Sequence, residues 1–162
     1  MDQPVEVVEA DLDNTDHQRD VLALTDAYAL DPMGGGASLS SEKLGRLIDG
    51  LRAHPTTVIL LAHAGDKAVG IATCFLGYST FDARPLLNVH DLAVLPQHRG
   101  LRVGAKLLEA VEQKARALGC GRITLEVGDD NVRAKRLYEL AGFAQPSSDA
   151  AGSLLFYMKT LT

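Results

Sequence analysis

One stretch decides how this chain folds, and it reads VLPQHRGLRVG over residues 94–104. Pro96 ends a strand because proline has no N–H to donate to a sheet, and an apolar pattern with helical spacing begins at Val103. A glycine-containing loop between a strand and a helix directs several backbone N–H groups and the positive end of the helix dipole at one point. The loop therefore suits an anion such as a pyrophosphate. It matches neither G-x-x-x-x-G-K-[ST] nor the G-x-G-x-x-G dinucleotide loop.

The segments around this loop alternate between strand and helix. We expect a strand over 88–94, a helix over 103–118, a strand over 122–127 and a helix over 131–142. Gly119 follows the first of these helices, as is common at a helix end. The strand–helix–strand order predicts that the two strands are parallel neighbours.

The N-terminal half carries a different pattern. Residues 5–10 favour an edge strand, and Thr15 with Gln18 forms a capping-box pattern for a helix that runs to Leu30. The segment DPMGGG over 31–36 breaks that helix, and a second amphipathic helix begins near Ser40. Strands over 58–61 and 69–78 form a hairpin, and 154–158 reads as a last strand.

Length and composition narrow the class of protein. The chain has 162 residues, and we expect one domain over 1–162. Its net charge of −5 disfavours a general nucleic-acid binder, which needs a basic face. No apolar run approaches membrane-spanning length, so we expect a cytoplasmic protein without a membrane partner. Cys74, Cys120 and the histidines show no metal-ligand spacing, so no metal is expected.

Two motifs in the correct order resemble one family. Residues 99–104, RGLRVG, are similar to [QR]-x-x-G-x-[GA], preceded by V-x-P, and residues 131–143, NVRAKRLYELAGF, are similar to N-x-x-A-x-x-L-Y-x-x-x-G-F. These are motifs of the GCN5-related N-acetyltransferases, and the resemblance covers about the last half of the chain. It implies an α/β fold of the α+β type, with a mixed twisted sheet of about six to seven strands, about four helices and splayed central parallel strands. An acetyl-CoA-binding core would cover 86–143, with acceptor-specificity elements over 15–55 and 78–87.

The resemblance also implies which residues bind acetyl-CoA. Arg102 departs from the family, which has glycine at its position; because the contact uses backbone N–H groups, a side chain pointing to solvent fits, and the arginine adds charge near a phosphate. A backbone N–H near Leu92 or Ala93 would meet the oxyanion. The implied cofactor-binding residues are Leu92, Ala93, Val94, Arg99, Gly100, Leu101, Arg102, Val103, Gly104, Asn131, Ala134 and Arg136.

Acid–base chemistry needs a proton donor and a base. By resemblance, Tyr138 lies beside the thioester sulfur, where its O–H can protonate the departing thiolate. The alternative is that Asn131 only caps its helix and Tyr138 only packs. The acceptor amine must lose a proton, and the candidate bases are His90, Asp91 and Glu126. A hydrogen-bonded strand histidine, or carboxylates that are solvated or in ion pairs, are the alternatives.

The acceptor site should lie in the N-terminal half and the loop before the fourth strand. Candidate substrate-binding residues are Tyr28, Tyr78, Phe81 and Asp82. Five carboxylates are available on the acceptor side, namely Asp31, Glu42, Asp82, Asp91 and Glu126. A cationic acceptor is consistent with this charge.

The function that we expect is transfer of an acetyl group from acetyl-CoA to a primary amine of a small molecule, by direct attack in a ternary complex. Neither cysteine lies in a motif for a nucleophile. The alternatives are acetylation of a protein N-terminus or lysine, and a non-catalytic acyl-CoA-binding regulatory module. A homodimer is expected through a terminal strand.

Overall fold

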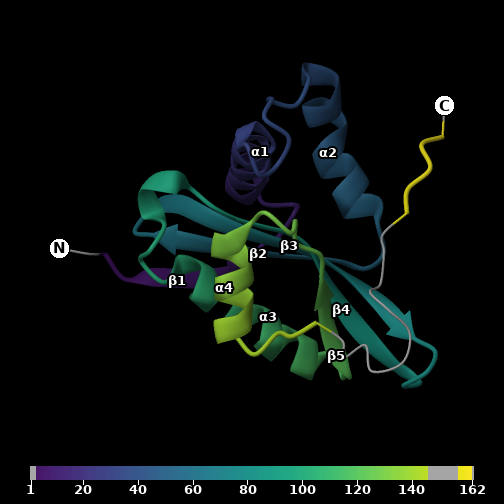
Figure 1. Ribbon diagram of the computed structural model, residues 1–162. Coiled ribbons are helices and arrows are strands. Elements are labelled where there is room, and N and C mark those ends of the chain that lie inside the picture. The colour runs from purple at the N-terminus through teal and green to yellow at the C-terminus, as the bar shows by residue number, and fades with distance from the viewer. Residues whose placement is uncertain (1–2, 146–156, 162) are drawn as a thin grey trace.

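The structure, a computed structural model, describes residues 3–145 and 157–161, which form one mixed five-stranded sheet (Figure 1). Its strands, in spatial order, are β1 (Val5–Glu9), β2 (Thr57–Ala64), β3 (Lys67–Ser79), β4 (Arg84–Val94) and β5 (Arg122–Leu125). β1 to β4 pair antiparallel and β4 pairs parallel with β5, as the order of elements predicts. The described part thus holds fewer strands than the expected six to seven. The strand expected over 154–158 lies largely outside the described residues.

Helices cover both faces of this sheet (Figure 1). α1 (Thr15–Leu30) and α2 (Ser41–Ala53) lie over one face, and α3 (Val103–Ala117) lies over the other. The short 3-10 helix η1 (Pro96–His98) links β4 to α3, and α4 (Val132–Leu140) follows β5 and packs beside α3.

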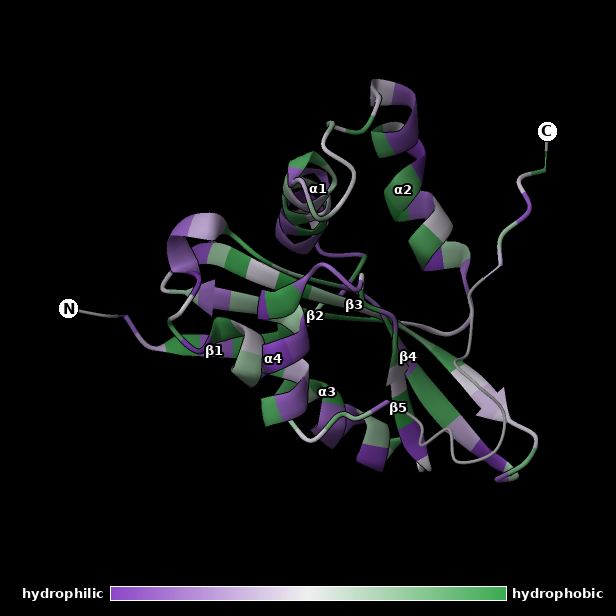
Figure 2. Cartoon of the chain, viewed as in Figure 1, coloured by the Kyte–Doolittle hydropathy of each residue, from purple (hydrophilic) through white to green (hydrophobic). Residues whose placement is uncertain are grey.

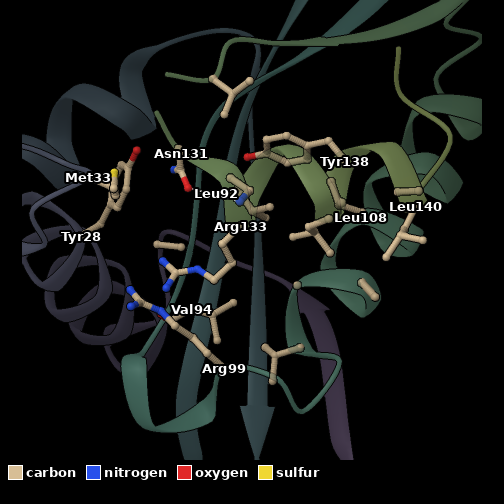
Figure 3. A pocket seen from close by; sticks show the side chains of 18 of the residues that line it. Tyr28, Met33, Leu92, Val94, Arg99, Leu108, Asn131, Arg133, Tyr138 and Leu140 are labelled. Carbon is tan, nitrogen blue, oxygen red and sulfur yellow. Dashed lines mark hydrogen bonds between the residues drawn. The ribbon is translucent and has the colours of Figure 1, made fainter. Parts of the chain in front are cut away.

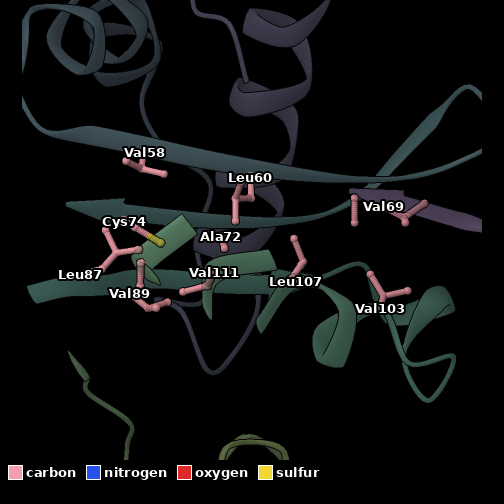
Figure 4. Packing of buried hydrophobic residues seen from close by; sticks show 12 residues of the cluster. Val58, Leu60, Val69, Ala72, Cys74, Leu87, Val89, Val103, Leu107 and Val111 are labelled. Atoms are coloured by element: carbon pink, nitrogen blue, oxygen red, sulfur yellow. The ribbon is translucent and has the colours of Figure 1, made fainter. Parts of the chain in front are cut away.

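Two apolar clusters hold these layers together, one on each face. Side chains of β2 alternate between them, so that its central run is buried on both sides. The cluster under α3 is shown in Figure 4 and includes Val58, Leu60, Ala72, Leu87, Val89, Leu107 and Val111. The cluster under α1 and α2 includes Val21, Leu24, Ile48, Ile59, Leu61 and Ile71. Figure 2 shows the same division, with apolar residues along the strands and on the helix sides that face them. Each buried valine, leucine or isoleucine of these clusters contributes about 1.5–3 kcal/mol.

The N-cap of α1 differs from the one that the sequence pattern predicts. α1 is capped by Asn14, whose side-chain oxygen accepts from the N–H groups of Asp16 and His17, and the capping box expected from Thr15 and Gln18 does not form. Thr15 already has helical geometry, so it cannot act as the cap. Ser40 caps α2 as expected, by accepting from the Lys43 N–H.

β4 is longer than the sequence predicts, and β5 is shorter. β4 includes Pro85, expected in a loop, because the Pro85 carbonyl still accepts from the Gly121 N–H at 2.9 Å. β5 ends at Leu125 rather than at 127, because pairing between the two strands ends at Val89 and Leu125.

A β-bulge marks the point where the two strands separate. In the register of β3 and β4, Cys74 faces Val89 but Thr73 faces Asp91, which leaves His90 as the extra residue. β4 continues from there to Val94 without a neighbour on the β5 side among the described residues. The splayed parallel strands that the family resemblance implies are thus present.

Candidate functional site

A cavity of about 760 Å³ opens where β4 and β5 separate (Figure 3). Its walls come from the end of α1, from β4, from the loop before α3, from the start of α3, from the segment after β5, and from α4. It thus joins the two motifs found in the sequence with the N-terminal half of the chain. Its apolar lining includes Leu24, Met33, Leu92, Val94, Leu108 and Leu137.

The loop over 99–104 forms one wall of the cavity and leads into α3. Gly100 and Arg102 both have left-handed backbones, with φ of 77° and 62°. The first hydrogen bond of α3 runs from the Lys106 N–H to the Arg102 carbonyl. Among the described residues, the N–H groups of 100–105 donate to no other group of the protein. Such a set of free donors at a helix N-terminus fits a phosphate.

Gly104 allows α4 to approach this turn. A Cβ atom at that position would lie 2.8 Å from Cδ2 of Leu137 in α4, which is closer than side chains tolerate. A glycine here therefore lets the Leu137 side chain pack directly against the first turn of α3. The open cleft, the free donors and the narrow apolar floor together fit a donor of the CoA type, as the resemblance implies.

The charges around the loop differ from what the sequence suggests. Arg99 donates from Nη2 to Asp31 at 2.5 Å and from Nε to the Val94 carbonyl at 3.1 Å. Arg102 is 76% exposed and lies 3.6 Å from Glu109. Asp31, expected on the acceptor side, is thus beside the donor loop, and its hydrogen bond with Arg99 holds its pKa below the usual range.

Asn131 and Ala134 line the cavity from α4. The Asn131 side chain also accepts from the Ala134 N–H at 3.2 Å, so it caps α4 as well as facing the cavity. Arg136 and Leu101, predicted to contact the donor, are not among the lining residues. The other cofactor-binding residues expected from the resemblance do line it, namely Leu92, Ala93, Val94, Arg99, Gly100, Arg102, Val103 and Gly104.

Two tyrosines face each other across the cavity. Tyr138 of α4 is 9% exposed, and the hydroxyl groups of Tyr138 and Tyr28 point into the cavity from opposite walls (Figure 3). Burial, with a contribution from Tyr28, raises the pKa of Tyr138 to about 12. Its hydroxyl therefore keeps its proton at neutral pH and can donate it. Burial and the nearby Asp91 and Asp31 also raise the pKa of Tyr28.

The three candidate bases occupy different positions. Glu126 lines the cavity just beyond β5. Asp91 is partly buried in β4 beyond the bulge and is not among the residues that line the cavity, and burial raises its pKa. His90 is exposed at the bulge, outside the cavity lining, and its ring packs edge-on against Phe75 at a centroid distance of 5.6 Å.

Only one of the four predicted substrate-binding residues is brought to the cavity. Tyr28 lines it, whereas Tyr78, Phe81 and Asp82 lie at the far end of the β3–β4 hairpin. Tyr78 is largely exposed, Phe81 is fully exposed, and Asp82 forms an ion pair with Arg122. These three residues are separated from the cavity because β3 and β4 extend beyond the level at which β5 begins.

Sequence reasoning missed several side chains that line the cavity, among them Met33 and Arg133. Arg133 follows Asn131 by two positions, so the motif itself could have identified it. Met33 lies in the α1–α2 loop, and no local pattern distinguishes it from an ordinary loop residue. No helix in the described ranges is long and apolar enough to cross a bilayer.

Comparison with known proteins agrees with this geometry. The model of the acetyltransferase (GNAT) family matches residues 23–143. An uncharacterized N-acetyltransferase of Archaeoglobus fulgidus is 33% identical over 96 residues, covering 59% of this chain and 65% of that protein. Thialysine N-epsilon-acetyltransferase of Mus musculus is 35% identical over 92 residues, covering 57% of this chain and 53% of that protein. The match thus spans less than two thirds of either relative.

Solved structures share the fold over almost the whole chain. The crystal structure of a probable acetyltransferase superposes with a TM-score of 0.78 at 21% identity and covers 95% of this chain and 99% of its own. The family model includes both motifs, the splayed strands and the start of the cavity in α1. The chain therefore belongs to the acetyltransferase (GNAT) family.

Proposed function

We propose that this chain is an acetyl-CoA-dependent N-acetyltransferase that acts on a primary amine of a small molecule by direct attack in a ternary complex. One observation carries the proposal: the cavity joins a turn of free N–H donors to a buried, protonated Tyr138 across splayed strands. The name of the thialysine N-epsilon-acetyltransferase relative supports an acceptor with a primary amine.

The donor would be held mainly by backbone and apolar groups. The free N–H groups of 100–105 face its phosphates, while Leu92, Val94 and Ala134 border the cavity between that turn and Tyr138. When bound, acetyl-CoA supplies an activated acetyl thioester. The N–H groups of β4 that have no partner beyond Val89 on the β5 side support the proposed oxyanion site near Leu92 and Ala93.

Two side chains would transfer protons during the reaction, one as the donor and one as the acceptor. Tyr138 holds a proton at the wall of the cavity, ready for the leaving sulfur. Glu126, which also lines the cavity, would accept a proton from the ammonium of the acceptor, directly or through water. Asp91, on the same strand as the bulge, would attract that ammonium ion and is the second candidate for the base.

The cysteines support direct transfer rather than a covalent acetyl-enzyme. Cys74 is fully buried, and burial raises the pKa of its thiol to about 12. Burial also raises the pKa of Cys120, and neither thiol lines the cavity. A thiol of this kind is protonated at neutral pH and is a poor nucleophile.

A thiol-release assay tests the proposal. The protein is incubated with acetyl-CoA and a panel of polyamines, lysine analogues, aminoglycosides and peptides, and free CoA is measured. Release with a small amine supports the proposal, and release with peptides alone would favour the protein acetyltransferase. CoA binding without release across the panel would favour the non-catalytic module. A stable mass increase with acetyl-CoA alone would contradict direct transfer.

Replacement of Tyr138 by Phe tests the proton donor. We expect kcat to fall about 100-fold or more, because general acid catalysis contributes about that much. CoA affinity, measured by calorimetry, should stay within about twofold. Tyr157→Phe makes the same chemical change at a tyrosine that is 85% exposed and serves as the control. Unchanged kcat in Tyr138→Phe would show that the hydroxyl has no such role.

A further inference from the structure

The guanidinium group of Arg99 is already engaged by the protein. Its Nη2 donates to Oδ2 of Asp31 at 2.5 Å, and its Nε donates to the Val94 carbonyl. Both side chains are well covered, with exposed fractions of 27% for Arg99 and 12% for Asp31. A covered, charge-assisted pair of this kind is costly to break, because one charge would be left without its partner. Arg99 is therefore a poor source of charge for an incoming phosphate.

Asp31 in turn organises the α1–α2 loop. Its other carboxylate oxygen accepts from the Met33 N–H at 2.9 Å. Its backbone carbonyl accepts from the N–H groups of Gly34, Gly35 and Gly36, at 2.8–3.1 Å. The pair between Arg99 and Asp31 thus joins the α1–α2 loop to the turn over 99–104, across 68 residues of sequence.

Arg133 lines the cavity from α4, and its positive charge also helps to lower the pKa of Asp31. It lies in the first turn of α4, lines the cavity and is exposed. Among the described residues, no acidic side chain lies within ion-pair distance of it. Figure 3 shows its side chain directed across the cavity toward Val94 and Arg99. A guanidinium group in this place can donate two parallel hydrogen bonds to a phosphate.

We propose that Arg99 is a positioning residue that clamps the α1–α2 loop to the donor turn through Asp31, and that Arg133 supplies the guanidinium group for a phosphate of the donor. This inference rests on the proposed function, since it assigns roles within the same donor site. It departs from the sequence motifs, which place Arg99 among the donor-binding residues and assign no role to Arg133.

Calorimetric titration of CoA into the full chain, over a range of salt concentrations, tests the roles proposed for Arg99 and Arg133. Arg133→Gln should weaken CoA binding at least tenfold, since a hydrogen bond to a charged group contributes about 1.5–3 kcal/mol. It should also make the affinity less dependent on salt. The double variant Arg99→Gln, Asp31→Asn removes both charges of the clamp together, so neither is left unpaired. Its CoA affinity and salt dependence should stay within about twofold of the original protein.

A second readout separates the clamp from a general structural role. In the double variant, hydrogen exchange at the amides of 34–36 should become at least tenfold faster, while exchange in α3 stays unchanged. Arg46→Gln, which removes an exposed arginine of α2 far from the cavity, is the charge-matched control. The inference is overturned if the double variant loses CoA affinity and salt dependence, or if Arg133→Gln behaves like Arg46→Gln. Failure of the unmodified protein to bind CoA would instead refute the proposed function itself.

Discussion

Asp91, a candidate base, illustrates how a residue proposed to act in catalysis can reduce stability. Burial raises its pKa above the ordinary value of 3.8, so folding disfavours its charged form. We expect Asp91→Asn to have a higher melting temperature at pH 7 and at least tenfold lower kcat/KM for an amine acceptor. An increase in stability together with a loss of activity is typical of residues selected for function.

The stability gained by Asp91→Asn should depend on pH, because it comes from removing a charge that folding disfavours. Well below pH 3.8 the aspartate is protonated in both the folded and the unfolded state, so its charge no longer contributes to the difference in stability between the original protein and Asp91→Asn. The advantage of the Asn variant should appear as the pH rises and should be complete above the raised pKa. Calorimetric melting of both proteins at several pH values between 3 and 8 measures it. A constant difference across that range would mean that the charge of Asp91 is not the cause.

Arg102 is a second residue at which the backbone decides the outcome. Its φ of 62° is left-handed, which costs a side-chain-bearing residue about 1–2 kcal/mol and glycine almost nothing. We expect Arg102→Gly to be more stable than Arg102→Ala by about 1 kcal/mol, measured by urea unfolding. Both variants lose the charge and the exposed contact with Glu109, so only the backbone distinguishes them. Equal stability would contradict a strained backbone at this position.

In the α1–α2 loop, too, the backbone decides what a substitution does to stability. A Cβ atom on Gly34 would lie 1.9 Å from the Tyr28 carbonyl oxygen, whereas a Cβ on Gly45 in α2 would meet nothing within 4 Å. Gly34→Ala should therefore lower the free energy of unfolding by about 1–3 kcal/mol, because the end of α1 must move. Gly45→Ala should raise it by about 0.5–1 kcal/mol, because alanine is the better helix former.

Urea unfolding of the two alanine variants provides the comparison, and each serves as the control for the other. The glycine run over 34–36 is explained by this loop rather than by flexibility: its N–H groups converge on one carbonyl, and Gly34 packs against another. If both variants had the same stability, the close approach at Gly34 would not matter to the fold.

The whole molecule should respond to its donor through the cavity. A ligand that binds only the folded state stabilises it by about 2.7 kcal/mol at 100 times its dissociation constant. For a domain of this size we expect CoA at that concentration to raise the melting temperature by about 5–10 °C. Hydrogen exchange should slow in the turn over 99–105 and at the start of α4, the two walls that the donor would join. No shift in melting temperature would contradict a preformed donor site.

Local chemistry in the sequence determined a large part of this picture. Pro96, the glycines of the turn and the apolar spacing after Val103 predict a strand, an anion-binding turn and a helix, because each depends on residues only a few positions apart. The order of these elements also predicts the parallel pair of β4 and β5, since a helical crossover permits no other simple arrangement. Asn131 and Tyr138 fall on one face of α4 for the same local reason.

The tertiary structure decided which side chains from distant parts of the chain meet at the cavity. The bulge at His90 depends on how β4 pairs with β3, and it moves Asp91 and Leu92 relative to β5. Tyr28 lines the cavity together with residues of the C-terminal half, and Asp31 pairs with Arg99. In both cases the residues that meet are far apart in the chain. A carboxylate in a sequence shows its charge but not its partner, because the partner is set by packing of the two halves of the fold. The two motifs therefore identified the family, and the sheet register and the α1–α2 loop determined which of their side chains are free to act.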